Sequence, residues 1–195
     1  DLETLSEADF GNGRSVGDEL TEKIATIGEN LTLRRASAID LESKNGVVTG
    51  YMHNQTAPGL GKIGVLVGLE SDGDTEKLNE LGKKIAMHVA AAFPQFLNPE
   101  DVDQESLDRE RAIFKDQAIA SGKPPEIAEK MVEGRIRKNY EQDCLTQHNF
   151  VIDNETKISK LLEEAGKEIG APVKLVAFDR VQLGEGLDKE LSEAA

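Results

Sequence analysis

The stretch KIGVLVGLESDGDTEKLNELGKKIAMHVAAAF, residues 62–93, decides the fold class. Its first nine residues are rich in β-branched and aliphatic side chains, which predicts a strand over 62–70. The hydrophobic period then becomes that of a helix over 74–93, and Pro94 stops it. The apolar face of this helix consists of Leu78, Leu81, Ile85, Val89 and Ala92. Together with the β-rich runs before this stretch and the helices and strand after it, the pattern predicts an α+β protein with antiparallel sheets flanked by helices.

On the N-terminal side, the pattern predicts one helix and two further strands. Ser15 and Gly28 are suitable cap residues for a helix over 15–29. Two β-rich runs follow over 31–41 and 47–53, and turn residues separate them from each other and from the strand over 62–70. The resulting α-β-β-β-α unit covers 15–98, and the Gly-Asn-Gly ending of the first residues predicts a leader loop over 1–14.

On the C-terminal side, two long charged helices are predicted over 99–120 and 124–142. Only Ser121, Gly122 and Lys123 separate them, so they must be antiparallel and form a helical hairpin insertion over 99–146. The expected seam of this coiled-coil hairpin is thin. It places Leu107, Phe114 and Ala118 against Ile127, Met131 and Ile136.

The remaining chain predicts a short extended piece over 149–152, a helix over 157–169 and a strand over 173–183. This strand either rejoins the first three strands or builds a second sheet. Residues 147–188 are therefore expected to complete a two-layer core, and 189–195 form a short acidic tail.

Composition limits the partners. The chain has 195 residues and a formal net charge of -14, and its basic runs are short, which argues against nucleic acid and anionic membranes as partners. No apolar stretch approaches the ~20 residues of a membrane span, and no export signal is visible. The single cysteine predicts a reducing compartment. Because residue 1 is Asp rather than Met, a trimmed chain or fragment is expected.

No motif indicates an enzyme, a metal site or a cofactor. Residues 59–64 match G-x-G-x-x-G, but a loop precedes the motif and a strand follows it, whereas a phosphate-binding motif opens a helix. The histidines His53, His88 and His148 lack ligand spacing. Cys144 lies four residues before His148, yet an acidic neighbourhood does not activate a thiol.

His88 is the most informative single residue. It is predicted at the edge of the apolar stripe of the helix over 74–93, among small alanines. Two interpretations remain open: a half-buried histidine with a local hydrogen bond, or a contact residue for another protein.

Seven ordered stretches together resemble bacterial elongation factor Ts, the guanine-nucleotide exchange factor of elongation factor Tu. They are Ala25–Arg35, Tyr51–Asn54, Lys62–Val67, Ile85–Ala91, Ser121–Pro124, Glu129–Arg135 and Gly184–Gly186. The resemblance implies a core of antiparallel sheets with an inserted coiled-coil hairpin, and a protein that binds elongation factor Tu with GDP and releases the GDP. It also implies a cytoplasmic protein of bacteria or one of an organelle matrix.

The resemblance implies that His88 contacts the nucleotide-binding domain of elongation factor Tu, with Met87 and Ile63 as neighbours. Glu7–Phe10 looks like the family's wedge motif, but Gly11-Asn12-Gly13 replaces the continuing helix, so the match is rejected. Against the family pattern, the N-terminal small helical domain and the first part of the core are also expected to be absent, and exchange is expected to be weaker. The competing hypotheses are a module that forms a homodimer through the hairpin and a nucleotide-binding enzyme built on residues 59–64.

Overall fold

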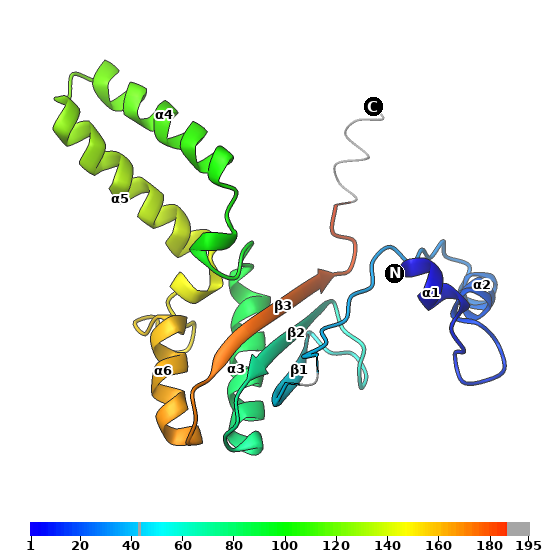
Figure 1. Ribbon diagram of the computed structural model, residues 1–195. Helices are drawn as coiled ribbons and strands as arrows, with labels where there is room; N and C mark the ends of the chain where they lie inside the picture. Colours follow the sequence, from blue (N-terminus) through cyan, green and yellow to red (C-terminus); the bar gives the residue numbers. More distant parts are fainter. Residues whose placement is uncertain (43, 187–195) are drawn as a thin grey trace, which may run out of the picture. The chain divides into compact units, whose positions relative to one another are not determined.

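The computed structural model describes residues 1–42 and 44–186 (Figure 1). The contacts between Cα atoms divide the chain into two compact units, of which the first is Asp1–Ala38 and the second begins at Ile39. The predicted tail over 189–195 lies outside the described residues. The predicted division of the chain into five segments by residue number stays a prediction, although individual elements within it are confirmed or corrected below.

The first unit contains two helices, of which one was predicted. Helix α2, Val16–Ile27, begins after the Ser15 side chain, which accepts a hydrogen bond from the Asp18 amide, and ends at Gly28 with φ of 79°. The prediction of a leader loop over 1–14 is wrong in part, because α1 occupies Leu2–Glu7. The Asp1 side chain caps α1 by accepting a hydrogen bond from the Thr4 amide at 2.8 Å.

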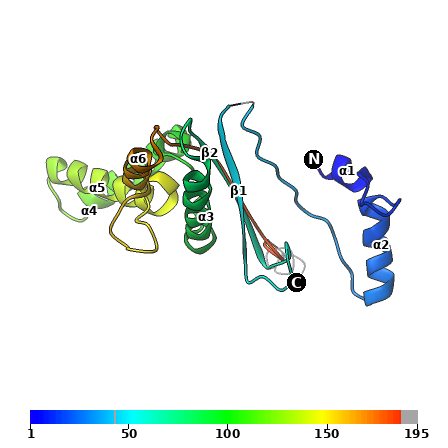
Figure 2. The same ribbon diagram turned by 90° about the horizontal axis from the view of Figure 1, so that it is seen from below.

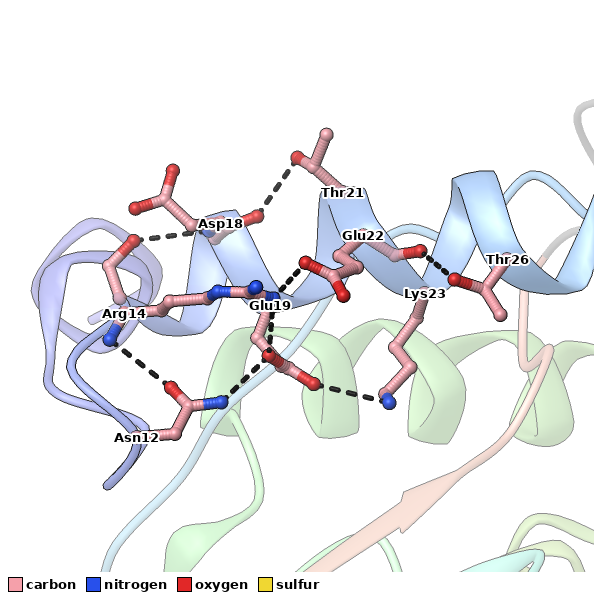
Figure 3. A network of polar contacts seen from close by, with 10 residues as sticks. Asn12, Arg14, Asp18, Glu19, Thr21, Glu22, Lys23 and Thr26 are labelled. Atoms are coloured by element: carbon pink, nitrogen blue, oxygen red, sulfur yellow. Dashed lines mark hydrogen bonds and ion pairs between the residues drawn. The ribbon is translucent and has the colours of Figure 1, made fainter.

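A polar network closes the loop between α1 and α2 (Figure 3). The buried carboxylate of Glu19 accepts from Asn12 Nδ2 at 3.0 Å and pairs with Lys23 Nζ at 3.2 Å. Arg14 contacts both Glu19 and Glu22. The hydrogen bond from Asn12 and then that from Lys23 lower the pKa of Glu19. The network therefore holds an ionised carboxylate against the start of α2.

The strand predicted over 31–41 does not form. The structure has neither helix nor strand over 30–41, and the boundary between the two units falls after Ala38. Leu31 and Leu33 alternate as a strand would, but residues 34–38 are Arg-Arg-Ala-Ser-Ala and are all exposed. Residues 34–38 therefore offer no apolar face to a sheet. The alternation of apolar and polar residues ends at residue 33, which is too short to support pairing with another strand.

The second unit is built on one antiparallel sheet of three described strands in the order β1-β2-β3. The strands are β1, Gly46–His53, β2, Ile63–Glu70, and β3, Lys174–Gln182. The last strand therefore rejoins the sheet rather than building another. It lies beside β2 on the side away from β1, whereas the strand predicted over 31–41 was expected beside β1. The register sets Thr49 beside Val67 and Val65 beside Arg180.

Helix α3, Thr75–Ala92, covers one face of this sheet (Figure 2). The alternating strand residues Val65, Val67 and Leu69 pack with apolar residues of the helix, and all are buried. Gly82 of α3 packs closely on Thr49 of β1, because a Cβ atom at Gly82 would lie 2.5 Å from Thr49 Oγ1. The predicted helix and its apolar face are confirmed, and this contact forms the two-layer core.

The predicted hairpin is confirmed as α4, Gln104–Ala120, and α5, Pro125–Asp143, which lie side by side in Figure 1. A 3-10 turn over Pro99–Asp101 replaces the first part of the predicted helix. The expected seam is confirmed for Ile136 of α5 but is wrong for Ile127 and Met131. The buried residues of α5 are Ala128, Val132 and Ile136, whereas Ile127 and Met131 are 47% and 48% exposed. The two exposed residues precede Ala128 and Val132 by one position, which turns them away from α4 by about 100°.

Helix α6, Ile158–Ile169, follows the hairpin and confirms the predicted helix. The extended piece predicted over 149–152 is wrong beyond its first residue. Asn149 forms a single bridge with Lys157, and then the chain turns, with Phe150 N donating to Thr156 O and Asn154 N donating to Phe150 O. Among the described residues, no helix is long and apolar enough to cross a membrane.

Candidate protein-interaction site

The structure places the three predicted contact residues in two elements. Met87 and His88 share one turn of α3, whereas Ile63 is the first residue of β2 on the sheet. Met87 and Ile63 are half-buried and so keep part of their surface accessible. His88 is only 1% exposed, so its predicted position at the edge of the apolar stripe is wrong. A contact between the His88 side chain and another protein stays a prediction.

The His88 ring belongs to a chain of buried hydrogen bonds that joins three parts of the second unit. Its Nδ1 atom accepts from the Val151 amide at 3.2 Å, and its Nε2 atom lies 3.2 Å from His148 Nδ1. His148 Nε2 lies 2.8 Å from the carbonyl oxygen of Gln142, near the end of α5. We call this set, from Val151 through both rings to Gln142, the histidine relay.

The relay is complete only when both histidines are neutral. The Val151 amide can only donate, so the His88 proton sits on Nε2 and is donated to His148 Nδ1. The His148 proton is then on Nε2 and is donated to Gln142 O. Burial and the nearby His148 lower the pKa of His88 to about 4, and burial also lowers the pKa of His148. All four ring nitrogens are satisfied without a net charge.

The relay shows what His88 does in the folded chain. It ties α3 to the end of the hairpin and to the loop that precedes α6, and Phe150 packs 6.0 Å from its ring. Its partners His148 and Val151 were not predicted from the sequence. Both lie about 60 residues after His88 in the sequence, on the far side of the hairpin insertion. No hydrophobic periodicity links them to α3.

The structure explains two features of the sequence, the glycine motif over residues 59–64 and Cys144. Residues 59–64 lead into strand β2 and not into a helix, so the motif lacks the helix N-terminus that the nucleotide-binding hypothesis required. Cys144 is buried, and burial raises the pKa of its thiol to about 11, which keeps it protonated. Within residues 1–42 and 44–186, no three His, Cys, Asp or Glu side chains gather as a metal site would require.

Comparison with known proteins points to one family. The family model described as Elongation factor TS matches residues 1–185. Elongation factor Ts of Paramagnetospirillum magneticum is 61% identical over 185 residues, which cover 95% of this chain and 59% of that protein. Those of Rhodospirillum rubrum and Rhodospirillum centenum are 57% and 56% identical, and each match covers 100% of this chain and 63% of the relative. The chain thus spans about three fifths of the length of the curated relatives it matches.

Proposed function

Because the chain belongs to the elongation factor Ts family, we propose that it binds elongation factor Tu with GDP and promotes the release of that GDP. The family match over residues 1–185 is the observation that carries this proposal. The place of action is then the bacterial cytoplasm, where elongation factor Tu works. No covalent step is required of this chain, so we propose that it is a binding protein and not an enzyme.

The proposed mechanism is a coupling between two binding equilibria. A protein that binds the nucleotide-free GTPase more tightly must lower the affinity of the GTPase for its nucleotide. The nucleotide must then lower the affinity of the GTPase for that protein by the same factor. Typical couplings change affinity about 5- to 150-fold. Because the chain spans about three fifths of its relatives, we propose a smaller acceleration of GDP release than a full-length relative gives.

We propose Ile63 and Met87 as direct contacts, since both keep accessible surface. His88 does not contact the partner in this proposal. It acts through the histidine relay, which holds α3 and the base of the hairpin in one arrangement. A rigid docking surface loses less conformational entropy on binding than a mobile one. His88 is therefore a positioning residue in this proposal.

A homodimer through the hairpin is a second candidate, and the exposed side chains of α5 favour it. Ile127 and Met131 are four residues apart, so they lie on the same face of the helix, and both are about half exposed. A second hairpin could cover this apolar face. The two proposals can both hold, because the predicted contacts Ile63 and Met87 lie outside the hairpin.

Sedimentation velocity separates the two candidates. The chain is run alone at two concentrations, and then with elongation factor Tu in its nucleotide-free and GDP-bound states. We expect a faster-sedimenting complex with the nucleotide-free GTPase and less of it with GDP. No complex in either state would reject the exchange-factor proposal. For the dimer, the sedimentation coefficient should rise with concentration, and Met131→Glu should remove that rise while Glu129→Gln keeps it.

A further inference from the structure

Arg180 is a buried cation that the histidine relay and the proposed contacts leave unexplained. It lies on β3 opposite Val65, on the face of the sheet that α3 covers. Its side chain is 9% exposed, and its guanidinium carbon lies 4.2 Å from the centre of the Phe93 ring. Phe93 itself ends α3 and is 44% exposed. The guanidinium is therefore enclosed on one side by a ring that reaches the surface.

The guanidinium is only partly satisfied. Its Nη2 atom donates to Gln182 Oε1 at 2.8 Å, but Nε and Nη1 are buried without a hydrogen-bond partner among residues 1–42 and 44–186. Nη1 lies 3.9 Å from Glu185 Oε1, a distance for charge attraction and too long for a hydrogen bond. Buried donors without partners are rare in folded proteins and are unfavourable. These two nitrogen atoms therefore have hydrogen-bonding capacity that no residue among 1–42 and 44–186 uses.

A hollow of about 560 Å³ lies beside these donors. Its floor is formed by five consecutive residues of β3, Val176–Arg180, and the segment Phe93–Leu97 forms a wall. Strand β3 is at the edge of the described sheet, so the backbone groups on its outer side have no ladder partner there. An extended peptide segment can lie along such an edge and take part in backbone hydrogen bonds.

The charges around the hollow favour a neutral acceptor. Three carboxylates line it, those of Asp101, Asp179 and Glu185, against the single guanidinium of Arg180. An anionic ligand would meet these carboxylates as like charges, whereas a main-chain carbonyl oxygen accepts from Arg180 without adding charge. The exposed Phe93 ring offers an apolar surface for a neighbouring side chain of the same segment.

Arg180 and Phe93, which line the hollow, are connected through the sheet and through α3 to the residues proposed as contacts for elongation factor Tu. Ile63 pairs with Gln182, the residue that Arg180 holds, and both face the same side of the sheet as Arg180. Phe93 directly follows α3, the helix that carries Met87. We propose that an extended segment of elongation factor Tu docks in this hollow, with a main-chain carbonyl oxygen accepting a hydrogen bond from Arg180. This inference rests on the proposed function and adds a site to it.

Calorimetric titration with nucleotide-free elongation factor Tu tests the proposal. Arg180→Met keeps the apolar stem and removes the donors, and we expect it to weaken the affinity about 10-fold or more, the effect of losing a hydrogen bond to a charged donor. Phe93→Gly removes the ring and suits the backbone φ of 53°, so it should stay folded and weaken the affinity several-fold. Arg109→Met, on the exposed surface of α4, is the matched control and should bind as the unmodified chain does.

The outcomes distinguish the two levels of the proposal. If the unmodified chain binds and both Arg180→Met and Phe93→Gly bind equally well, the docking site is rejected while the proposed function stands. If the unmodified chain does not bind elongation factor Tu, both are rejected. Thermal unfolding of each variant shows whether it is folded, and Phe93→Gly decides the question if Arg180→Met does not fold.

Discussion

Replacing His88 with alanine should lower the free energy of unfolding by about 3 kcal/mol. The substitution leaves a cavity where a fully buried ring was, and it leaves the Val151 amide and His148 Nδ1 without their partner. Large-to-small substitutions in a core and orphaned buried polar groups each destabilise by roughly 1 to 5 kcal/mol. Urea denaturation followed by circular dichroism measures the change as a shift in the midpoint.

Met87→Ala is the matched control, because Met87 is the preceding residue of the same helix and is only half-buried. We expect it to lower the free energy of unfolding by about 1 kcal/mol or less. Equal effects of the two substitutions would contradict the relay. If His88→Ala left stability unchanged and weakened binding to elongation factor Tu, the ring would be a direct contact, as the family resemblance implies.

The same relay should make stability depend on pH. In the unfolded chain a histidine has a pKa of about 6.5, whereas burial holds the pKa of His88 at about 4 in the folded chain. The unfolded state therefore binds more protons between these values. The stabilisation is fully present above about pH 6.5 and is lost as the pH falls toward 4. His88→Ala should make this part of the stability profile flatter.

Gly82→Ala should destabilise the chain by roughly 1 kcal/mol on balance, although alanine is the better helix former. An added Cβ would lie 2.5 Å from Thr49 Oγ1 and 2.9 Å from Thr49 Cβ, so α3 must move away from β1. Overpacking of this kind costs about 1 to 3 kcal/mol. It outweighs the gain of about 1 kcal/mol expected for replacing glycine within a helix. Thermal denaturation of the variant measures the net effect.

Gly134→Ala is the control for this second prediction. Gly134 is inside α5, and nothing lies within 4 Å of an added Cβ, so the substitution should stabilise by about 0.5 to 1 kcal/mol. Adding Thr49→Ala to Gly82→Ala should recover part of the lost stability, because it removes the hydroxyl at 2.5 Å from the new methyl group but keeps the Cβ atom at 2.9 Å. Destabilisation by Gly134→Ala, or no recovery in the double variant, would show that close packing at Gly82 is not the cause.

The elements with a clear local pattern were predictable from the sequence. Strand β2 and helix α3 follow their hydrophobic periods, and Ser15 and Gly28 cap α2 as expected. The prediction of a strand over 31–41 was wrong because the alternation of apolar and polar residues stops at Arg34. Pairing of β3 beside β2 could only be left open, since strand order depends on contacts between residues more than 100 positions apart.

The site was less predictable than the fold. The sequence indicates that His88 is in an amphipathic helix, but its burial depends on His148 and the loop at Val151, which the hairpin insertion separates from it. The phase of α5 was misjudged by one residue because Ile127 and Met131 are more apolar than the Ala128 that packs in the seam. In a thin seam, small residues allow close approach, and hydrophobicity alone does not identify the contact face.

The most direct test of the account is the rate at which elongation factor Tu releases labelled GDP. The GTPase carrying labelled GDP is mixed with excess unlabelled GDP and increasing amounts of this chain, and the bound label is followed with time. We predict that release accelerates with the concentration of the chain and reaches a plateau, lower than the plateau given by a full-length relative. A release rate that is the same with and without saturating chain would contradict the account.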